Sequence, residues 1–141
     1  PEMAAKEITT ALLKRLSKFD VVVLNFANGD MVGHTGDEKA TIKAMKCLDN
    51  QLKKIVPAVL KLNGAVLIAA DHGNAEQMWD NKHNVPLTSH TTNPVRFIMV
   101  SNEKYVARNG GLCDIAPTIL KLLNIKKPVE MTGKSLIKKI P

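Results

Sequence analysis

Apolar residues follow two kinds of pattern along this 141-residue chain, helical stripes and short continuous runs. In residues 3–17 and 37–62 they recur at steps of three or four, which is the spacing of one face of an α-helix. The longer stripe comprises Ile42, Met45, Leu48, Leu52, Ile55, Val59 and Leu62. Pro57 lies within this stripe, and we expect it to kink or interrupt the helix. A shorter stripe predicts a third helix at 113–123.

Three apolar runs predict strands, at residues 21–26, 65–70 and 95–100. They are rich in β-branched side chains and have almost no polar alternation, which is typical of strands buried on both faces. The predicted helix at 37–62 separates the first two runs, so the order strand, helix, strand indicates a βαβ unit with parallel strands. The polar segment 72–94 predicts a long loop. We therefore expect an α/β fold with a mostly parallel sheet.

Side chains of the metal-binding type follow the first two predicted strands or lie before the third: Asp30, His34, Asp71, His72 and His90. In open parallel sheets, sites form just outside the carboxyl ends of the strands, so these residues should gather at one edge. Aspartate and histidine together suit a divalent cation such as manganese or zinc. Five ligands exceed the needs of one tetrahedral ion, which points to two metals, a common means of handling phosphate esters.

Each of these residues also has an ordinary explanation when it is considered alone. Asp30 can cap the following helix, His34 can be a surface histidine, and residues 71–73 can form a polar turn. The presence of three of the four histidines at one predicted sheet edge favours the metal site. The fourth, His83, lies in a very polar loop, and we expect it to be solvated.

Composition narrows the function classes. The chain is 45% hydrophobic, which excludes a disordered segment, and has no apolar run of the about 18 residues that a membrane span needs. The net charge is +7, and residues 121–141 contain six Lys and one Glu without interleaved aromatic residues. This tail predicts a solvated surface rather than a nucleic-acid site. Cys47 and Cys113 are expected to be buried free thiols in a reducing compartment, the cytoplasm.

Several segments resemble the cofactor-independent phosphoglycerate mutases, and together they span the chain: Asn25–Asn28, Asp30–Gly36, Ala70–Met78, His90–Val95, Asp114–Leu120 and Pro128–Leu136. The resemblance implies a phosphatase-type metal domain with an alkaline-phosphatase-like three-layer fold. It also implies an isomerase of glycolysis that interconverts 3-phosphoglycerate and 2-phosphoglycerate. Two divalent ions are implied, with manganese expected and zinc, cobalt or magnesium as alternatives.

By the same resemblance, Asp30, His34 and His90 hold one metal, while Asp71 and His72 hold the other with further ligands from an earlier part of a longer chain. The phosphoryl group passes through a phosphoserine whose serine lies upstream, so no catalytic nucleophile is expected here. Residues 1–141 are then the C-terminal portion of the metalloenzyme domain, without the transferase domain. We expect the parent to be monomeric and this portion alone to be inactive.

Two other function classes stay open at the level of sequence. One is another alkaline-phosphatase-superfamily enzyme, such as a phosphopentomutase or a phosphatase, against which the segments Asn74–Met78 and Glu130–Ser135 argue. The other is a non-enzymatic module that binds through the basic tail. Product analysis with 3-phosphoglycerate separates the first from a phosphoglycerate mutase, and salt-dependent nucleic-acid binding identifies the second.

Overall fold

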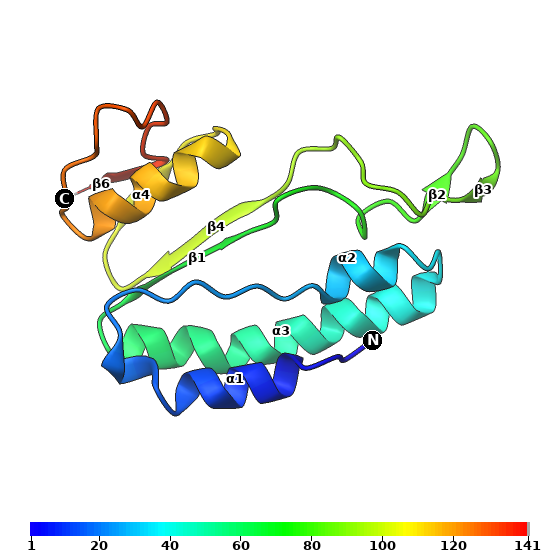
Figure 1. The fold of residues 1–141 in the computed structure, drawn as a ribbon, viewed down its shortest axis with the longest axis horizontal. Coiled ribbons are helices and arrows are strands. Elements are labelled where there is room, and N and C mark those ends of the chain that lie inside the picture. Colours follow the sequence, from blue (N-terminus) through cyan, green and yellow to red (C-terminus); the bar gives the residue numbers. More distant parts are fainter. Residues whose placement is uncertain (141) are drawn as a thin grey trace.

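The computed structural model describes residues 1–140 as an elongated α/β unit (Figure 1). Helices α1 (Ala5–Leu13) and α3 (Glu38–Lys61) lie side by side along one long side. Strands β1 (Ala65–Ala69) and β4 (Phe97–Ser101) form a ribbon along the other. The short helix α2 (Asn28–Gly33) packs on α3 at the end of the molecule near the N-terminus.

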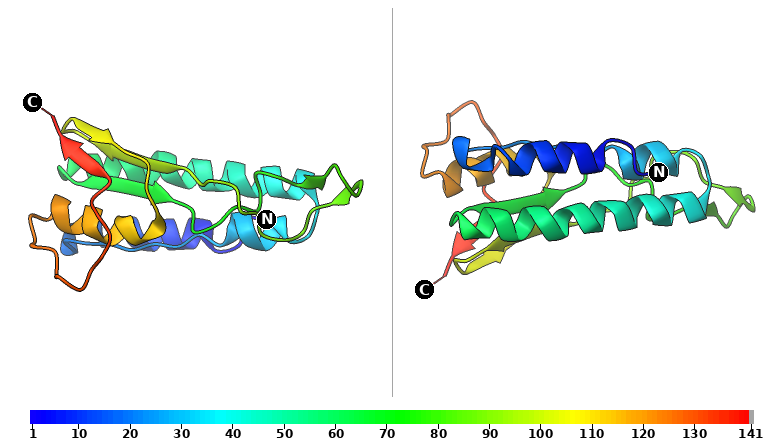
Figure 2. Two further views of the ribbon diagram at one scale, coloured as in Figure 1. Left: turned by 90° about the horizontal axis from the view of Figure 1, so that it is seen from above. Right: turned by 90° about the horizontal axis from the view of Figure 1, so that it is seen from below.

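The remaining elements are short and lie at the two ends of the molecule. Figure 2 shows one hairpin projecting beyond α2, while the C-terminal elements lie at the opposite end. These elements are β2 (Trp79–Asp80) and β3 (Val85–Pro86) in the hairpin, then β5 (Tyr105–Ala107), α4 (Ile115–Leu122) and β6 (Ile137–Lys139), with 3-10 turns at Leu16–Lys18 and Leu112–Asp114. The loop predicted at 72–94 is therefore largely irregular, as expected, but carries this hairpin.

The long helix predicted at 37–62 is confirmed as α3. It begins after Asp37, whose carboxylate accepts a hydrogen bond from the Ala40 N–H at 2.9 Å and so caps the helix. Of the kink or interruption expected at Pro57, the interruption is wrong, because the helix continues through it, and the kink stays a prediction. Pro57 cannot donate to the carbonyl of Lys53, but both residues are exposed, so water can satisfy that carbonyl.

The core lies where α1 and α2 pack against α3. Its buried side chains are mostly small, which lets the helix backbones approach closely: Ala5 and Thr9 on α1, Val32 on α2, and Thr41, Ala44 and Cys47 on α3. Cys47 is a buried free thiol as predicted, whereas Cys113 is exposed, contrary to the prediction. Within residues 1–140, no helix combines the length and apolar character needed to cross a membrane.

The predicted parallel strand pair does not form. Residues 21–26 run extended between α3 and β1 in Figure 1 but belong to no strand. Strand β1 instead pairs with β4, antiparallel, from Ala65 opposite Ser101 to Ala69 opposite Phe97. Every strand pair among the described residues is antiparallel.

Residues 21–26 form no strand because few neighbouring residues cover them. Val21, Val22 and Leu24 are exposed, and Val23 is 87% exposed, so the described residues provide little cover for their side chains. β-Branched residues favour an extended backbone, but a strand also needs a partner for its hydrogen bonds. The composition of residues 21–26 thus predicted the backbone shape correctly and the pairing wrongly.

A buried carboxylate fixes the C-terminal segment. Asp114, at the end of the second 3-10 turn, accepts hydrogen bonds from the backbone N–H groups of Lys134 at 2.7 Å and Gly111 at 3.2 Å. The guanidinium of Arg108 lies 3.4 Å away. The hydrogen bonds from Lys134 and Gly111 hold the pKa of Asp114 below its usual value. One side chain therefore joins three separate parts of the chain.

We expect Asp114→Asn to lower the midpoint of thermal unfolding at pH 7 by several degrees. Because the folded state lowers the pKa of Asp114, its stabilisation is fully present above the unfolded value of about 3.9. It is lost as the pH falls through the lower folded value. The difference from wild type should therefore shrink toward pH 3. Asp49→Asn, at an exposed pair with Lys53, is the control and should change little. A deficit that is the same at pH 7 and pH 3 would contradict this role.

Candidate metal centre

The first two predicted ligands are brought together by one turn of helix. Asp30 lies in the first turn of α2 and His34 directly follows its last residue. The His34 N–H donates to the Asp30 carbonyl at 3.1 Å, and the side chains meet with His34 Nε2 3.1 Å from Asp30 Oδ1. Helix α2 is held in place by the buried Asn28, whose amide donates to the carbonyls of Pro1 and Glu2 at 2.8 and 2.9 Å.

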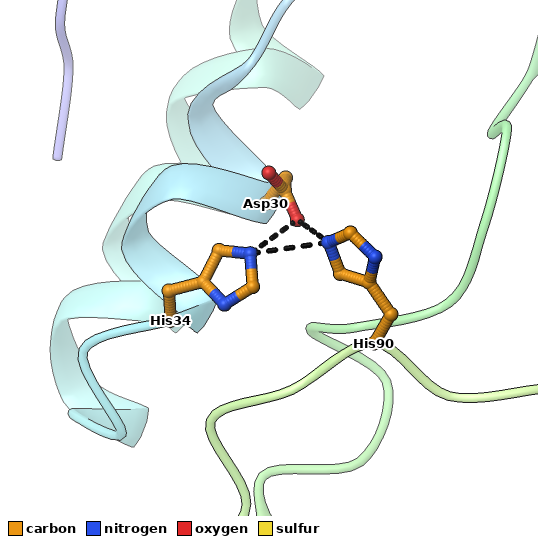
Figure 3. Close-up of side chains that lie close together, drawn as sticks. All are labelled: Asp30, His34 and His90. Carbon is orange, nitrogen blue, oxygen red and sulfur yellow. Dashed lines mark hydrogen bonds and ion pairs between the residues drawn. The ribbon is translucent and has the colours of Figure 1, made fainter.

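His90 joins them from the loop before β4. Its Nε2 lies 3.0 Å from Asp30 Oδ1 and 3.1 Å from His34 Nε2, as Figure 3 shows. Its loop is tied to the loop after β1 by the Thr91 N–H, which donates to the Gly73 carbonyl at 2.9 Å. Three ligand-type atoms from α2 and a distant loop thus converge on one point.

The hydrogen-bond partner of His34 Nδ1 leaves Nε2 as the nitrogen that can bind a cation. His34 Nδ1 lies 2.6 Å from the carbonyl oxygen of Thr88, which can only accept, so Nδ1 carries the hydrogen. In the neutral ring the lone pair of Nε2 then faces the Asp30 carboxylate. This is the arrangement by which metal-binding histidines are usually oriented.

The spacing also fits a small divalent ion. The three ligand atoms are 3.0–3.1 Å apart, close to the edge of about 3.4 Å that a tetrahedral ion with bonds of about 2.1 Å would require. A change of a few tenths of an ångström in the side chains would accommodate it. One carboxylate with two imidazoles suits manganese or zinc. The residues present therefore fit a metal.

The other two predicted ligands lie beside this cluster rather than within it. His72 stacks on the ring of His90, with centroids 3.7 Å apart, and its Nε2 is 4.0 Å from Asp30 Oδ1. The Asp71 carboxylate is 3.7 Å from the same nitrogen and its side chain is 77% exposed. Two ligands usually do not suffice for a stable site. Their role at a second metal stays a prediction.

His83 is separate from the site. It lies in the β2–β3 hairpin, is exposed, and its Nδ1 is 2.6 Å from the Asp80 carboxylate. This matches the expectation of a solvated histidine. It also makes His83 a suitable control for substitutions in the cluster.

Two residues that the sequence did not assign a role support the cluster. The amide of Asn74 donates to Asp30 Oδ1 at 2.8 Å, and this bond is the main cause of the lowered pKa of Asp30. Glu76 accepts from the Asn74 N–H at 2.6 Å and from the hydroxyl of Thr91, so it joins the loops of His72 and His90. Burial alone would raise the pKa of Glu76, but these hydrogen bonds lower it overall. In the sequence they were marked only by their position just after Asp71 and His72 and by the resemblance of the segment Ala70–Met78 to the phosphoglycerate mutases.

Comparison with known proteins agrees with the resemblance in the motifs. Residues 1–127 match the metalloenzyme superfamily. The 2,3-bisphosphoglycerate-independent phosphoglycerate mutase of Clostridium acetobutylicum is 56% identical over 140 residues, covering 96% of this chain and 28% of the relative. A second such enzyme, from Methanosarcina barkeri, is 54% identical, covering 99% of this chain and 27% of the relative.

A solved structure is also similar over the whole unit. The phosphoglycerate mutase of Leishmania mexicana, crystallised at low cobalt concentration, superimposes with a TM-score of 0.87 at 36% identity. The similarity covers 99% of this chain and 29% of that one. This chain thus spans under a third of the length of these relatives, and its predicted similarity to phosphoglycerate mutases is confirmed.

We expect calorimetric titration of the 141-residue chain with manganese to detect a single, weak site. Three ligand atoms converge at Asp30, His34 and His90, whereas Asp71 and His72 supply only two. His90→Ala should weaken binding at least about tenfold, because it removes a direct ligand. His83→Ala is the control and should bind like wild type. Two tight sites, or one site that His90→Ala leaves intact, would show that the ligands are assigned wrongly.

Proposed function

Because this chain belongs to the metalloenzyme superfamily, we propose that it provides metal-binding residues of a phosphoglycerate mutase that interconverts 3-phosphoglycerate and 2-phosphoglycerate. The observation that carries the proposal is the convergence of Asp30, His34 and His90. It occurs in a chain whose relatives are named 2,3-bisphosphoglycerate-independent phosphoglycerate mutases. A cation site beside an open surface suits a small substrate with a phosphate group.

The proposed site takes two divalent ions. Asp30, His34 and His90 would hold one, and Asp71 and His72 would contribute to the other. The further ligands, and the serine that accepts the phosphoryl group, would come from other parts of a longer protein, since this chain spans about 28% of its relatives. Manganese is our first choice of metal. Cobalt is the second, because the similar Leishmania mexicana enzyme was crystallised with it at low concentration.

The surrounding residues orient the proposed ligand atoms and leave them accessible to solvent. Thr88 holds the Nδ1 hydrogen of His34, so the opposite nitrogen is free to bind. The side chains of Asp30, His34 and His90 are 33%, 39% and 49% exposed, so the site is open on one side to a substrate. When bound, divalent ions of this kind neutralise phosphoryl oxygens and lower the pKa of a nucleophilic hydroxyl.

Other expectations belong to the same proposal. Residues 1–141 would be the C-terminal portion of the metalloenzyme domain. The complete protein would be a cytoplasmic monomer that acts on a small phosphorylated substrate and binds neither nucleic acid nor membranes. The basic residues of 121–141 would then be an ordinary solvated surface.

A chimera tests the proposal directly. We expect residues 1–141, placed in the Clostridium acetobutylicum enzyme in exchange for the aligned segment, to support manganese-dependent interconversion of the phosphoglycerates. The reason is the 56% identity over 140 residues, with all five proposed ligands on the exchanged segment. His90→Ala and Asp71→Ala should each lower kcat/KM at least about 100-fold, since each removes charge or ligation needed in the transition state. The 141-residue chain alone should be inactive.

The controls separate this activity from related chemistry. His83→Ala in the chimera should leave kcat/KM within about twofold of the parent chimera, because His83 pairs with Asp80 away from the site. Release of inorganic phosphate instead of the isomeric phosphoglycerate would identify a phosphatase. A correctly folded chimera that binds manganese but forms neither product would overturn the proposed function.

A further inference from the structure

A buried amide with an unused oxygen lies directly behind the proposed metal ligand Asp30. The side chain of Asn74 is almost completely buried, with 4% of the residue exposed. Its Nδ2 donates to Asp30 Oδ1 at 2.8 Å and lies 3.3 Å from the Asp30 backbone oxygen. Within residues 1–140, its Oδ1 has no hydrogen-bond partner. A buried polar atom without a partner destabilises the fold, so this arrangement needs an explanation.

The orientation of the Asn74 amide follows from the hydrogen-bonding capacity of the Asp30 carboxylate. An ionised carboxylate only accepts hydrogen bonds, so the NH₂ group of Asn74 must face it, and the amide oxygen must point away. The atom that receives this bond, Asp30 Oδ1, is also the atom nearest to His34 Nε2 and His90 Nε2. The amide therefore acts on the ligand atom itself, and its own oxygen is left unpaired as a consequence.

Gly33 makes the approach of the amide possible. A Cβ atom added to Gly33 would lie 2.8 Å from Asn74 Cγ, which is too close for two carbon atoms. The backbone of Asn74 is fixed from the other side, because its N–H donates to Glu76 Oε2 at 2.6 Å. Asn74 is thus held between Gly33 on α2 and the loop that carries Asp71 and His72.

From these contacts we infer that Asn74 is a positioning residue, which holds the Asp30 carboxylate toward His34 and His90. It also links the two proposed metal positions. Gly33 leaves the space that the Asn74 side chain occupies. The inference rests on the proposed metal site. Carboxylates that bind metals are commonly oriented by such second hydrogen bonds, and loss of one typically weakens metal affinity about 10–100-fold. A merely structural asparagine would affect folding and leave the geometry at the metal unchanged.

The test compares metal binding and stability in variants of the 141-residue chain. Asn74→Leu removes the donor and the unpaired oxygen together, and Asn74→Ala removes the same amide and leaves a smaller side chain. We expect both to raise the Kd for cobalt about 10–100-fold. The visible absorption of the bound cobalt, which reports coordination geometry, should change. For Asn74→Leu, the unfolding temperature without metal should be unchanged or higher. This combination of weaker binding with undiminished stability distinguishes positioning from a structural role.

Two glycines on α2 provide a matched pair. Gly33→Ala should displace the Asn74 amide and weaken cobalt binding, as the Asn74 variants do. In the double variant with Asn74→Leu, the two effects should not add. Gly29→Ala changes the same helix in the same way, but its Cβ would meet only the flexible Met45 side chain at 3.1 Å, so it should bind like wild type. Asn102→Leu, which removes an amide bonded to the Leu60 carbonyl, is the asparagine control.

The outcomes separate this inference from the metal site itself. If wild type binds cobalt and both Asn74 variants bind it equally well with the same absorption spectrum, the positioning role is wrong and the metal site stands. Loss of stability without a change in affinity would also overturn it. If wild type binds neither cobalt nor manganese, the proposed metal site fails, and the inference fails with it.

Discussion

One oxygen atom, Asp30 Oδ1, organises this end of the molecule. It faces Nε2 of His34 and His90 at 3.1 and 3.0 Å and accepts the amide hydrogen of Asn74 at 2.8 Å. These groups come from α2 and from two loops that are distant in sequence. The lone pair of His34 Nε2 faces this negatively charged oxygen, so a cation bound among the three side chains would relieve their repulsion. The local contacts and the proposed metal site therefore share the same oxygen atom.

The loops around this oxygen are held by polar contacts more than by apolar packing. Glu76 accepts from the Asn74 N–H, the Thr91 hydroxyl and the Asn93 amide, and Thr91 pairs with Gly73 through the backbone. The apolar core lies elsewhere, where α3 contacts α1 and α2. Helix α3 thus fixes the position of α2. The hydrogen bonds of Glu76 hold the two loops to each other, and Asn74 joins them to α2 through Asp30. Apolar packing therefore holds the helix and polar contacts hold the loops, and together they bring the ligand atoms to one point.

The helical spacing and the continuous runs of apolar residues in the sequence determined much of the architecture. The stripe at 37–62 is the single helix α3, the run at 65–70 is β1, and the run at 95–100 largely coincides with β4. Local patterns succeed here because a helix closes its own hydrogen bonds and is set by its buried face. The run at 21–26 shows the limit. Its residues favour an extended chain, but the antiparallel pairing of β1 with β4 and the exposure of Val23 depend on which partners are nearby.

The same division holds for the site. The sequence by itself determined which side chains can bind a metal, because aspartate and histidine chemistry is local, and the four-residue spacing of Asp30 and His34 required only one helical turn. Composition and spacing alone did not determine that His90 completes this cluster while Asp71 and His72 lie beside it, although the resemblance to the phosphoglycerate mutases implied that grouping. Nor did the sequence reveal that Asn74 holds the carboxylate and that Gly33 leaves room for it. Those relations join residues more than 40 positions apart in sequence, so only the tertiary structure could decide them.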